Sequence, residues 1–415
     1  MRKADSNESS PDSRAARLFR SNIAVIASSS AVNGFGTGIT STYVSYYFVS
    51  IGGDPIRLGI LTSLSTIIQC LVLFLGGRLA DHYGRRRVIV TAAFYAMLFP
   101  TLYALIRDWR IFFATSAIGA FGAISSPASH AIVADSIPVQ KRTTGISTLQ
   151  VVSTFPMIFS PLIGGWLIGI YGLQTGFRLA CAFVVGTTLV SAVILLLFLK
   201  ETIRRRNGQK LKVPGDPALS VRGALSGRPL HSLAAMLFAY GLIALANALV
   251  SSYYILYATQ VIGIDAPHFG IIVSLQIFLT ILLKIPGGWA SDRFGKKKIM
   301  IISIVTCTPF VVAFTFSRSF LEAAITIALL TIAGMYYAPS HEALQADLTP
   351  RQIRGRVTSF WDISGAVGGA LGAPLGGFLF QTVSPATPFY LFAVVEIAAA
   401  LLILVAVKEP QRAAD

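Results

Sequence analysis

Twelve long apolar runs constrain the fold of this chain more than any other feature of its sequence. A helix needs about 20 apolar residues to cross a hydrocarbon core of ~30 Å. The runs lie at about residues 21–50, 56–78, 86–106, 111–135, 142–170, 176–199, 231–262, 267–290, 298–317, 320–346, 353–381 and 387–407. A β-barrel would show alternating segments of about 10 residues instead. We therefore predict an all-α membrane protein with twelve transmembrane helices.

The composition favours lipid as the solvent for most of the chain. Charged residues make up 13% of the sequence and hydrophobic residues 54%, whereas soluble domains carry about 25% charged residues. This excludes a soluble enzyme and a disordered protein. The sequence shows no nucleophile–base pair, phosphate-binding loop or soluble domain, so we expect neither enzymatic activity nor a cofactor.

The basic residues gather on one side of the predicted membrane. With the N-terminus inside, 28 of the 34 Lys and Arg residues fall in inner segments, five in outer loops and one, Lys284, within a span. This bias predicts that both termini are cytoplasmic and that the protein is multi-pass in a plasma or inner membrane. It also accounts for the net charge of +16 without nucleic acid, because basic loops meet an anionic leaflet.

Signals of processing, disulfides or metals are missing from the sequence. Residues 1–20 are polar and precede the first span without an apolar stretch, so we interpret them as a mobile tail and not as a signal peptide. The cysteines, Cys70, Cys181 and Cys307, are odd in number and lie inside apolar runs. The five histidines have no metal-binding spacing, and we predict no disulfide and no metal site.

The chain repeats itself at an offset of about 211 residues. GGRLADHYGRRRVIV begins at Gly76 and GGWASDRFGKKKIMI at Gly287. Two further pairs follow in the same order, one from Ala128 and Pro339 and one from Pro161 and Pro374. We predict two parallel six-helix halves with a binding site between them at the midplane. The expected boundaries are a tail at 1–20, bundles at 21–200 and 231–408, a basic linker at 201–230 and a C-terminal tail at 409–415.

The loop Gly77-Arg-Leu-Ala-Asp81-His-Tyr-Gly84-Arg85-Arg-Arg resembles the signature loop between helices 2 and 3 of the major facilitator superfamily, and residues 288–298 form a weaker copy. The resemblance extends over about residues 20–408. It implies the fold of that superfamily, transport by alternating access, a small-molecule substrate and a monomeric protein in the bilayer. Glycines at positions 77 and 84 suit close helix approach and a sharp turn.

Charged residues around this loop suggest an inner gate. In the superfamily, equivalent positions form a latch that closes the inner side when the protein opens outward. The resemblance assigns this role to Gly77, Asp81, Gly84, Arg85, Asp135 and Arg142, with Asp292, Lys296, Asp347 and Arg354 in the second half. The alternative for the remaining basic residues of the loops is that they only enforce topology.

Ionisable residues inside the spans are candidates for coupling transport to protons, because buried charge in a membrane is costly. The candidates are Asp362, Glu342, His341 and Lys284. They could instead form a paired structural network of Lys284 with Glu342 or Asp362. Asp362 is the preferred titrating acid because it lies deeper than Glu342. Glu396 is interpreted as a structural acid, since the third helix of each triplet lies away from the cavity in the superfamily.

His130 and His341 are partners in the repeat. Either they cap the inner ends of their helices, or they titrate near neutral pH and assist coupling.

Cavity-lining residues follow from the resemblance, because the first and fourth helices of each half line the cavity in this superfamily. The candidate substrate contacts are Asn33, Thr37, Tyr43, Tyr240 and Asn247. Aromatic rings with a polar tip suit amphipathic organic ligands. The tyrosines near the outer ends have the alternative of an interfacial belt.

The sequence leaves two hypotheses for the substrate class and a third in which the protein is not a transporter. Ser160-Pro161-Leu-Ile-Gly-Gly is similar to an element of the drug:proton antiporter branch, whereas Thr115 stands where that branch carries a buried arginine. The first hypothesis is proton-driven export of small amphipathic organic compounds. The second is a facilitator or proton symporter for a small metabolite or organic anion, held by Lys284 and histidines. A transporter-like sensor is a remote third.

Overall fold

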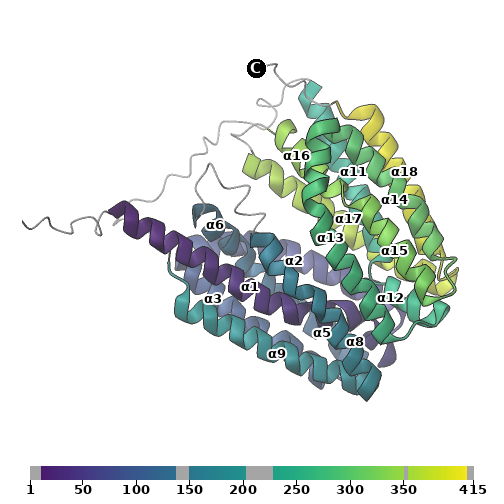
Figure 1. The fold of residues 1–415 in the computed structure, drawn as a ribbon, viewed down its shortest axis with the longest axis horizontal. Helices are drawn as coiled ribbons and strands as arrows, with labels where there is room; N and C mark the ends of the chain where they lie inside the picture. Colours follow the sequence, from purple (N-terminus) through teal and green to yellow (C-terminus); the bar gives the residue numbers. More distant parts are fainter. Residues whose placement is uncertain (1–10, 137–148, 202–227, 350–353, 409–415) are drawn as a thin grey trace, which may run out of the picture.

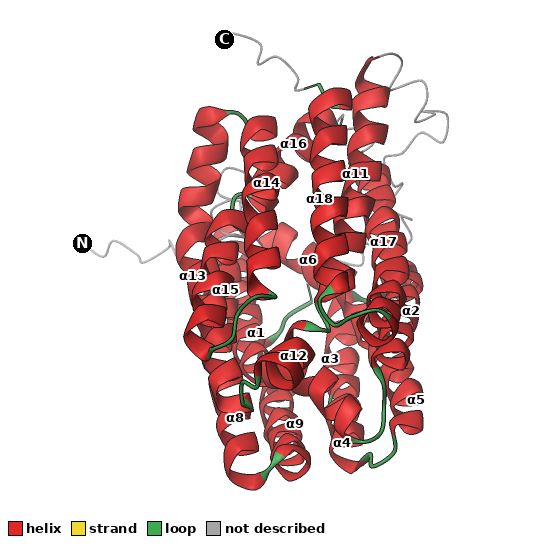
Figure 2. Ribbon diagram, turned by 90° about the vertical axis from the view of Figure 1, so that its right-hand side faces the viewer, coloured by secondary structure: helices red, strands yellow, loops and turns green. Residues whose placement is uncertain are grey.

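The computed structural model describes residues 11–136, 149–201, 228–349 and 354–408. These residues form helices joined by short loops and include no strand (Figure 2). The helices of the first half are α1 (Pro11–Ser50), α2 (Pro55–Tyr83), α3 (Arg85–Ala96), α4 (Leu98–Leu105), α5 (Trp109–Ala120), η1 (Phe121–Ser125), α6 (Ser126–Ser136), η3 (Phe155–Phe159), α8 (Ser160–Tyr171) and α9 (Leu173–Phe198). Those of the second half are α11 (Arg228–Val250), α12 (Tyr254–Tyr257), the π-helical turn η4 (Ala258–Ile262), α13 (Ala266–Phe294), α14 (Lys296–Phe314), α15 (Phe320–Gly334), α16 (Tyr337–Leu348), α17 (Arg354–Thr382) and α18 (Thr387–Ala406).

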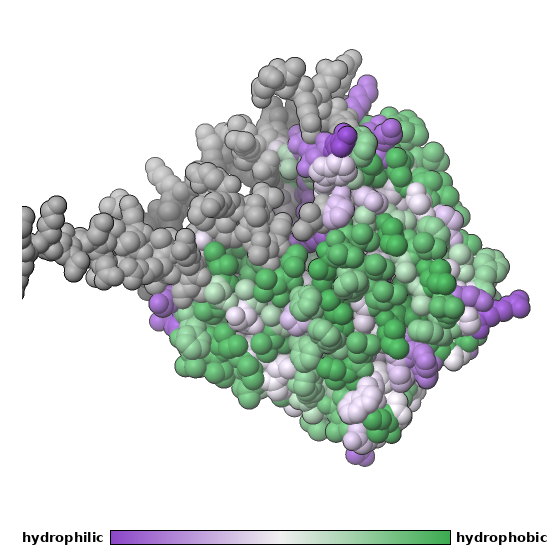
Figure 3. All heavy atoms as spheres, in the orientation of Figure 1, coloured by the Kyte–Doolittle hydropathy of each residue, from purple (hydrophilic) through white to green (hydrophobic). Residues whose placement is uncertain are grey.

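Within the described ranges, twelve helical stretches are long and apolar enough to cross a membrane, so the predicted fold class is confirmed. Their outer surface is apolar: Leu71, Phe316 and Val405 are large hydrophobic residues that are mostly exposed. Figure 3 shows hydrophobic residues over the middle of one face and hydrophilic residues at its margins. A surface of this kind suits contact with lipid chains and would not be stable in water.

The helices form two bundles, which we call the first bundle (the described residues up to Glu201) and the second bundle (those from Arg228 on) (Figure 1). Within each, the first and last helices pack along each other: α1 against α9, and α11 against α18. The predicted linker falls mostly outside the described residues, so the domain boundaries stay a prediction.

The two bundles meet mainly along two helix pairs, α2 with α17 and α8 with α13. Hydrogen bonds of Tyr43 with Ala266 and of Tyr253 with Pro55 join the bundles where α1 ends and where α2 and α13 begin, and we call this the closed end. Away from it the ribbons of the two bundles diverge towards what we call the open end (Figure 1). Small residues permit the contact, since Cβ atoms added at Gly59 and Gly377 would clash with backbone of the opposite bundle.

The backbone departs from the sequence prediction at the N-terminus and at Gly77, and agrees with it at Gly84. The expected N-terminal tail is helical from Pro11, where α1 begins, and residues 1–10 lie outside the described part. The sharp turn at Gly84 is confirmed by its φ of 96°, and Gly295 in the repeat has a φ of 97°. The close helix approach expected at Gly77 is wrong for the described residues, because nothing lies within 4 Å of a Cβ placed there.

Candidate functional site

A cavity of about 700 Å³ lies between the two bundles. The first bundle contributes Ser41, Thr42, Ser45 and Met157, and the second contributes most of the wall. Aliphatic and aromatic side chains dominate the wall, interrupted by a few polar groups such as Asn247 and Gln276. A largely apolar cavity with a few polar groups is the usual form of a site for a small organic molecule.

Glu396 is the most unusual residue of the cavity wall. It lies near the middle of α18 with 3% of its surface exposed. No hydrogen bond or ion pair to its carboxylate is found among the described residues. A charged carboxylate without a partner is costly in such surroundings, so this group needs either a proton or a cationic ligand. The sequence analysis set Glu396 aside on the family's helix arrangement; its position within an apolar run was the signal for it.

Lys284 is the other charged residue that lines the cavity. It is exposed, and its Nζ donates a hydrogen bond of 2.6 Å to Oε1 of Gln150 in the first bundle. The predicted network of Lys284 with Glu342 or Asp362 is wrong for this structure, in which both acids are exposed and no ion pair joins them to Lys284 in the described part of the chain. For Asp362 the reason is position, because its helix α17 packs mainly against α2 and α11 and not against α13.

His341 is buried in an aromatic cluster of the second bundle. Its ring stacks on Tyr240 and on Tyr337, with centroid distances of 4.8 Å and 5.5 Å, and meets the ring of Trp361 edge-on at 4.9 Å. Its repeat partner His130 is exposed. Neither side chain bonds to a helix end within the described ranges, so the repeat has placed one residue type in two different environments and the capping interpretation is not supported.

Of the five predicted substrate contacts, Asn247 alone lines the cavity. Tyr240 belongs to the aromatic cluster around His341. Thr188 donates a hydrogen bond of 3.4 Å to Oδ1 of Asn33, and Thr37 is exposed and donates to the backbone of its own helix. Tyr43 is fully buried in the closed end and does not line the cavity in this structure, so its role as a substrate contact stays a prediction.

The predicted inner gate is only partly described. The side chains of Asp81 and Asp135 and the whole of Arg142 lie outside the described residues. Gly84 and Arg85 join α2 to α3, and Asp292 lies exposed near the end of α13. In the second bundle Lys296 and Asp347 form an ion pair of 2.5 Å, which ties the start of α14 to the end of α16.

Glu201 is a residue of this region that sequence reasoning missed. Its Oε2 accepts a hydrogen bond of 3.0 Å from the backbone N–H of Arg86, in the first turn of α3. The guanidinium of Arg86 donates in turn to the carbonyl of Leu196, at 2.7 Å. The sequence signal for Glu201 was an acidic residue just after the sixth span, on the same side of the membrane as the basic residues that follow the second span. Within the described ranges, no group of three or more His, Cys, Asp or Glu side chains is placed to hold a metal ion.

Comparison with known proteins places this geometry among membrane transporters. The family model of the Major Facilitator Superfamily matches residues 26–240 and 236–415. The chain is 25% identical over 342 residues to the multidrug resistance protein MdtH of Cronobacter sakazakii, which covers 81% of each chain. It is 23% identical to the multidrug resistance protein MdtG of Dickeya zeae, over 78% of this chain and 79% of that one.

Solved structures show the same fold at lower identity. A bacterial homologue of the human lysosomal transporter Spinster, inward-facing and occupied, aligns with a TM-score of 0.73 at 16% identity, over 92% of this chain and 96% of that one. The human organic anion transporter MFSD10 aligns with a TM-score of 0.66 at 17% identity, over 93% and 99%.

Proposed function

Since the chain belongs to the Major Facilitator Superfamily of membrane transporters, we propose that it exports small amphipathic organic compounds in exchange for protons. The carrier acts as a monomer in the plasma or inner membrane. The multidrug resistance names of its relatives support export. The observation that carries the proposal is the buried carboxylate of Glu396 in an apolar cavity wall.

The exchange follows from the energetics of that carboxylate. An ionised acid in a low-dielectric wall is unstable unless a proton or another positive charge neutralises it. A protonated Glu396 is therefore suited to the empty cavity, and a cationic amphiphile stabilises the ionised form. Because the two neutralising species compete for one group, entry of one favours release of the other.

Alternating access gives this competition a direction. The closed end seals the cavity on one side, while the bundles diverge on the other (Figure 1). α2 and α13 begin at the closed end and run away from it, so the basic residues that follow them, from Arg85 and from Lys296 on, lie towards the open end. We assign that end to the cytoplasm and this conformation to the inward-facing state. A substrate enters from the cytoplasm, and a proton enters after the bundles have rocked.

The remaining candidates for proton coupling occupy the open side of the structure. Asp362 and Glu342 are exposed, so neither carboxylate is enclosed as that of Glu396 is. Of the two, we assign only Asp362 a secondary role in bringing protons to the cavity, and we expect Glu342 to take no part in the exchange. His341, enclosed by aromatic rings, is the coupling candidate with the least access to water.

The test is exchange measured on purified protein in liposomes with an internal pH dye, with ethidium as the lipophilic cation. Wild-type protein should release protons when ethidium enters, and Glu396→Gln should reduce this proton movement at least tenfold. Glu342→Gln is the matched control, because it neutralises an exposed acid of the same bundle. Proton exchange that is equally strong in Glu396→Gln would exclude Glu396 as the exchanging group.

Transport of an organic anion is the second candidate, and Lys284 favours it. The ammonium group lines the same cavity and is accessible, so it can meet a carboxylate. Liposomes preloaded with salicylate distinguish the two functions: counterflow of salicylate without ethidium-linked proton movement would support the anion reading.

A further inference from the structure

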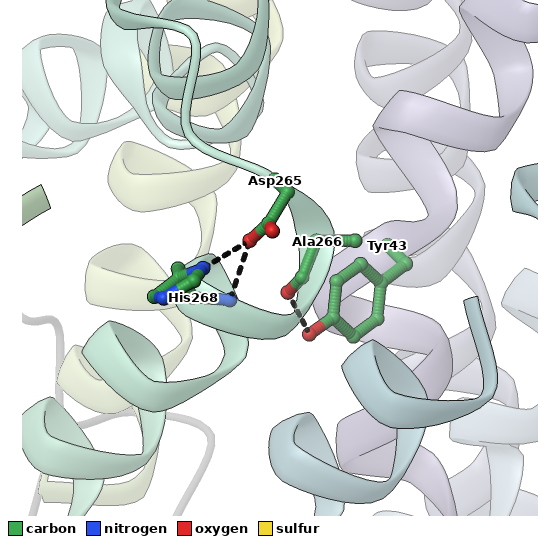
Figure 4. A network of polar contacts seen from close by, with 4 residues as sticks. All are labelled: Tyr43, Asp265, Ala266 and His268. Atoms are coloured by element: carbon green, nitrogen blue, oxygen red, sulfur yellow. Dashed lines mark hydrogen bonds and ion pairs between the residues drawn. The ribbon is translucent and has the colours of Figure 1, made fainter. Parts of the chain in front are cut away.

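Two buried tyrosines join the bundles at the closed end. Tyr43 of α1 is fully buried. Its hydroxyl donates towards the carbonyl oxygens of Pro161 in α8, at 2.7 Å, and of Ala266 in α13, at 3.1 Å. Figure 4 shows the contact with Ala266. Pro161 belongs to the same bundle as Tyr43, whereas Ala266 is the first residue of a helix in the second bundle. One phenol therefore spans the interface between bundles.

Tyr253 repeats this arrangement from the other side. It precedes α12 in the second bundle and is also fully buried. Its hydroxyl donates towards the carbonyl oxygens of Ala373 in α17, at 2.8 Å, and of Pro55 in α2, at 3.2 Å. Pro55 is the first residue of α2, as Ala266 is of α13. Each tyrosine thus reaches from its own bundle to the start of the second membrane span of the other bundle, which is α13 for Tyr43 and α2 for Tyr253.

Glycines leave the space that these hydroxyls occupy. A Cβ on Gly270 would lie 2.5 Å from the Tyr43 hydroxyl oxygen, and one on Gly165 would lie 2.7 Å away. The same distance of 2.7 Å separates the Tyr253 hydroxyl oxygen from a Cβ on Gly59 or on Gly377. Real Cβ atoms are not found so close, so both hydroxyls depend on a glycine in each of two facing helices.

Two other tyrosines show what is special about this pair. Tyr47 lies one turn after Tyr43 and donates to the carbonyl of Ile106, at 2.7 Å, within the first bundle. Tyr257 lies one turn after Tyr253 and donates to the carbonyl of Thr315, at 2.7 Å, within the second bundle. All four hydroxyls donate to backbone carbonyls, but those of Tyr47 and Tyr257 stay within their own bundle, as does the bond of 3.3 Å that Tyr47 accepts from Arg178.

We infer that Tyr43 and Tyr253 are paired latches that hold the closed end shut and set the ratio of the two states of the carrier. Both cross-bundle contacts must break when the closed end opens, whereas those of Tyr47 and Tyr257 stay within rigid bundles. A hydrogen bond lost from one state alone shifts the equilibrium between the states. The inference requires only that the bundles rock, and it holds for any substrate and with or without proton exchange.

The experiment measures the distance between spin labels across the closed end in lipid nanodiscs, without substrate or pH gradient. Thr175→Cys in the first bundle and Val383→Cys in the second are exposed label sites. Cys70, Cys181 and Cys307 are replaced by alanine in all variants. Double electron–electron resonance spectroscopy then gives the fractions of molecules in which the two labels lie close together or far apart.

Tyr43→Phe and Tyr253→Phe should each raise the ratio of long to short separations, by roughly threefold to tenfold for one net hydrogen bond. The double variant should multiply the two single effects, because both latches act on one equilibrium. Tyr47→Phe and Tyr257→Phe are the controls and should leave the ratio within twofold of the wild type. All four changes remove one buried hydroxyl and keep the ring.

Unchanged ratios in both latch variants would overturn the inference, and so would equal shifts in the control variants, which would indicate general loosening. Because no transport is measured, failure of the proposed proton exchange cannot imitate any of these outcomes.

Discussion

Lys284 of α13 and Gln150 of the first bundle share a hydrogen bond of 2.6 Å across the central cavity. The lysine is therefore held by a neutral group, and its charge is not cancelled there. Glu396 lies in the same wall, buried, without a hydrogen bond to Lys284 in the described part of the chain. The cavity thus presents an accessible positive charge and an enclosed carboxylate, and this pair decides between the two substrate classes.

Neutralising the lysine should separate those classes. Lys284→Gln should weaken the binding of salicylate at least threefold and strengthen that of ethidium, because repulsion of cations is removed from an otherwise apolar wall. Titration calorimetry on purified protein measures both. Lys297→Gln is the control, since Lys297 donates to the carbonyl of Leu404 and does not line the cavity. Identical affinities in the wild type and Lys284→Gln would contradict this reading.

Asn247 should contribute directly to substrate affinity. Its amide lines the cavity and donates one hydrogen bond, of 2.9 Å, to the carbonyl of Ile243. Asn247→Ala should weaken ethidium binding by roughly twofold to tenfold, the range for one net hydrogen bond. Asn33→Ala serves as the comparison, because Asn33 accepts a bond from Thr188 away from the cavity. The prediction fails if the two alanine variants bind equally well.

Glu201 should stabilise the start of α3 independently of transport. Its carboxylate accepts a hydrogen bond from the backbone N–H of Arg86, as a helix-capping group does. Glu201→Ala should lower the free energy of unfolding by about 1 kcal/mol, measured by chemical unfolding in detergent. Glu342→Ala is the control with an exposed acid. A loss of transport with unchanged stability would point to a gating role instead.

The stability of the closed end should depend on acid pH through Asp265. This residue caps α13. Oδ1 of Asp265 accepts a hydrogen bond of 2.9 Å from the backbone N–H of His268 and lies 2.5 Å from Nδ1 of the His268 ring (Figure 4). Burial raises the pKa of Asp265, but the backbone and ring hydrogen bonds and the charge of His268 lower it more, so its pKa lies below the usual value. The ring of His268 also meets the edge of Phe320, and Tyr43 binds the adjacent carbonyl.

The sign follows from that lowered pKa. The stabilisation is complete above the ordinary aspartate value of about 3.9 and is lost as pH falls through the lower pKa of the folded protein. The unfolding temperature of the wild type should therefore drop below about pH 4 more steeply than that of Asp265→Asn. His268→Gln removes the ring hydrogen bond and the charge that lower the pKa of Asp265, so the folded-state pKa lies nearer the ordinary value and the loss of stability at acid pH should be smaller. Parallel curves for all three proteins would count against this assignment.

The sequence predicted the fold well because the determining signals are local. Each apolar run predicts one helix from its own residues. The repeat can be read directly from the sequence, for example from the paired glycines at 84 and 295, which have matching φ values. The site was predicted less well, because residue type does not determine environment. His130 and His341 are equivalent in sequence, yet one is exposed and the other is enclosed by aromatic rings.

Contacts between distant helices account for the other differences. Lys284, Glu342 and Asp362 all lie within predicted spans of the second half, which suggested an ion pair. The side chain of Lys284 instead reaches the first bundle, where it bonds to Gln150. Tyr43 has the residue type of a ligand contact, but its depth in the interface follows from glycines more than a hundred residues away. Glu396 stands out in the sequence as an acid within an apolar run, but its place in the cavity wall depends on the cavity reaching α18.

The complete burial of Tyr43 and Tyr253 also bears on the electrical insulation of the membrane. A chain of water molecules through the closed end would conduct protons and dissipate the membrane potential whenever the carrier waits for a substrate. Both phenol rings are 0% exposed and fill the places where two helix pairs cross. A carrier closed in this way can remain idle for long periods without discharging the membrane in which it lies.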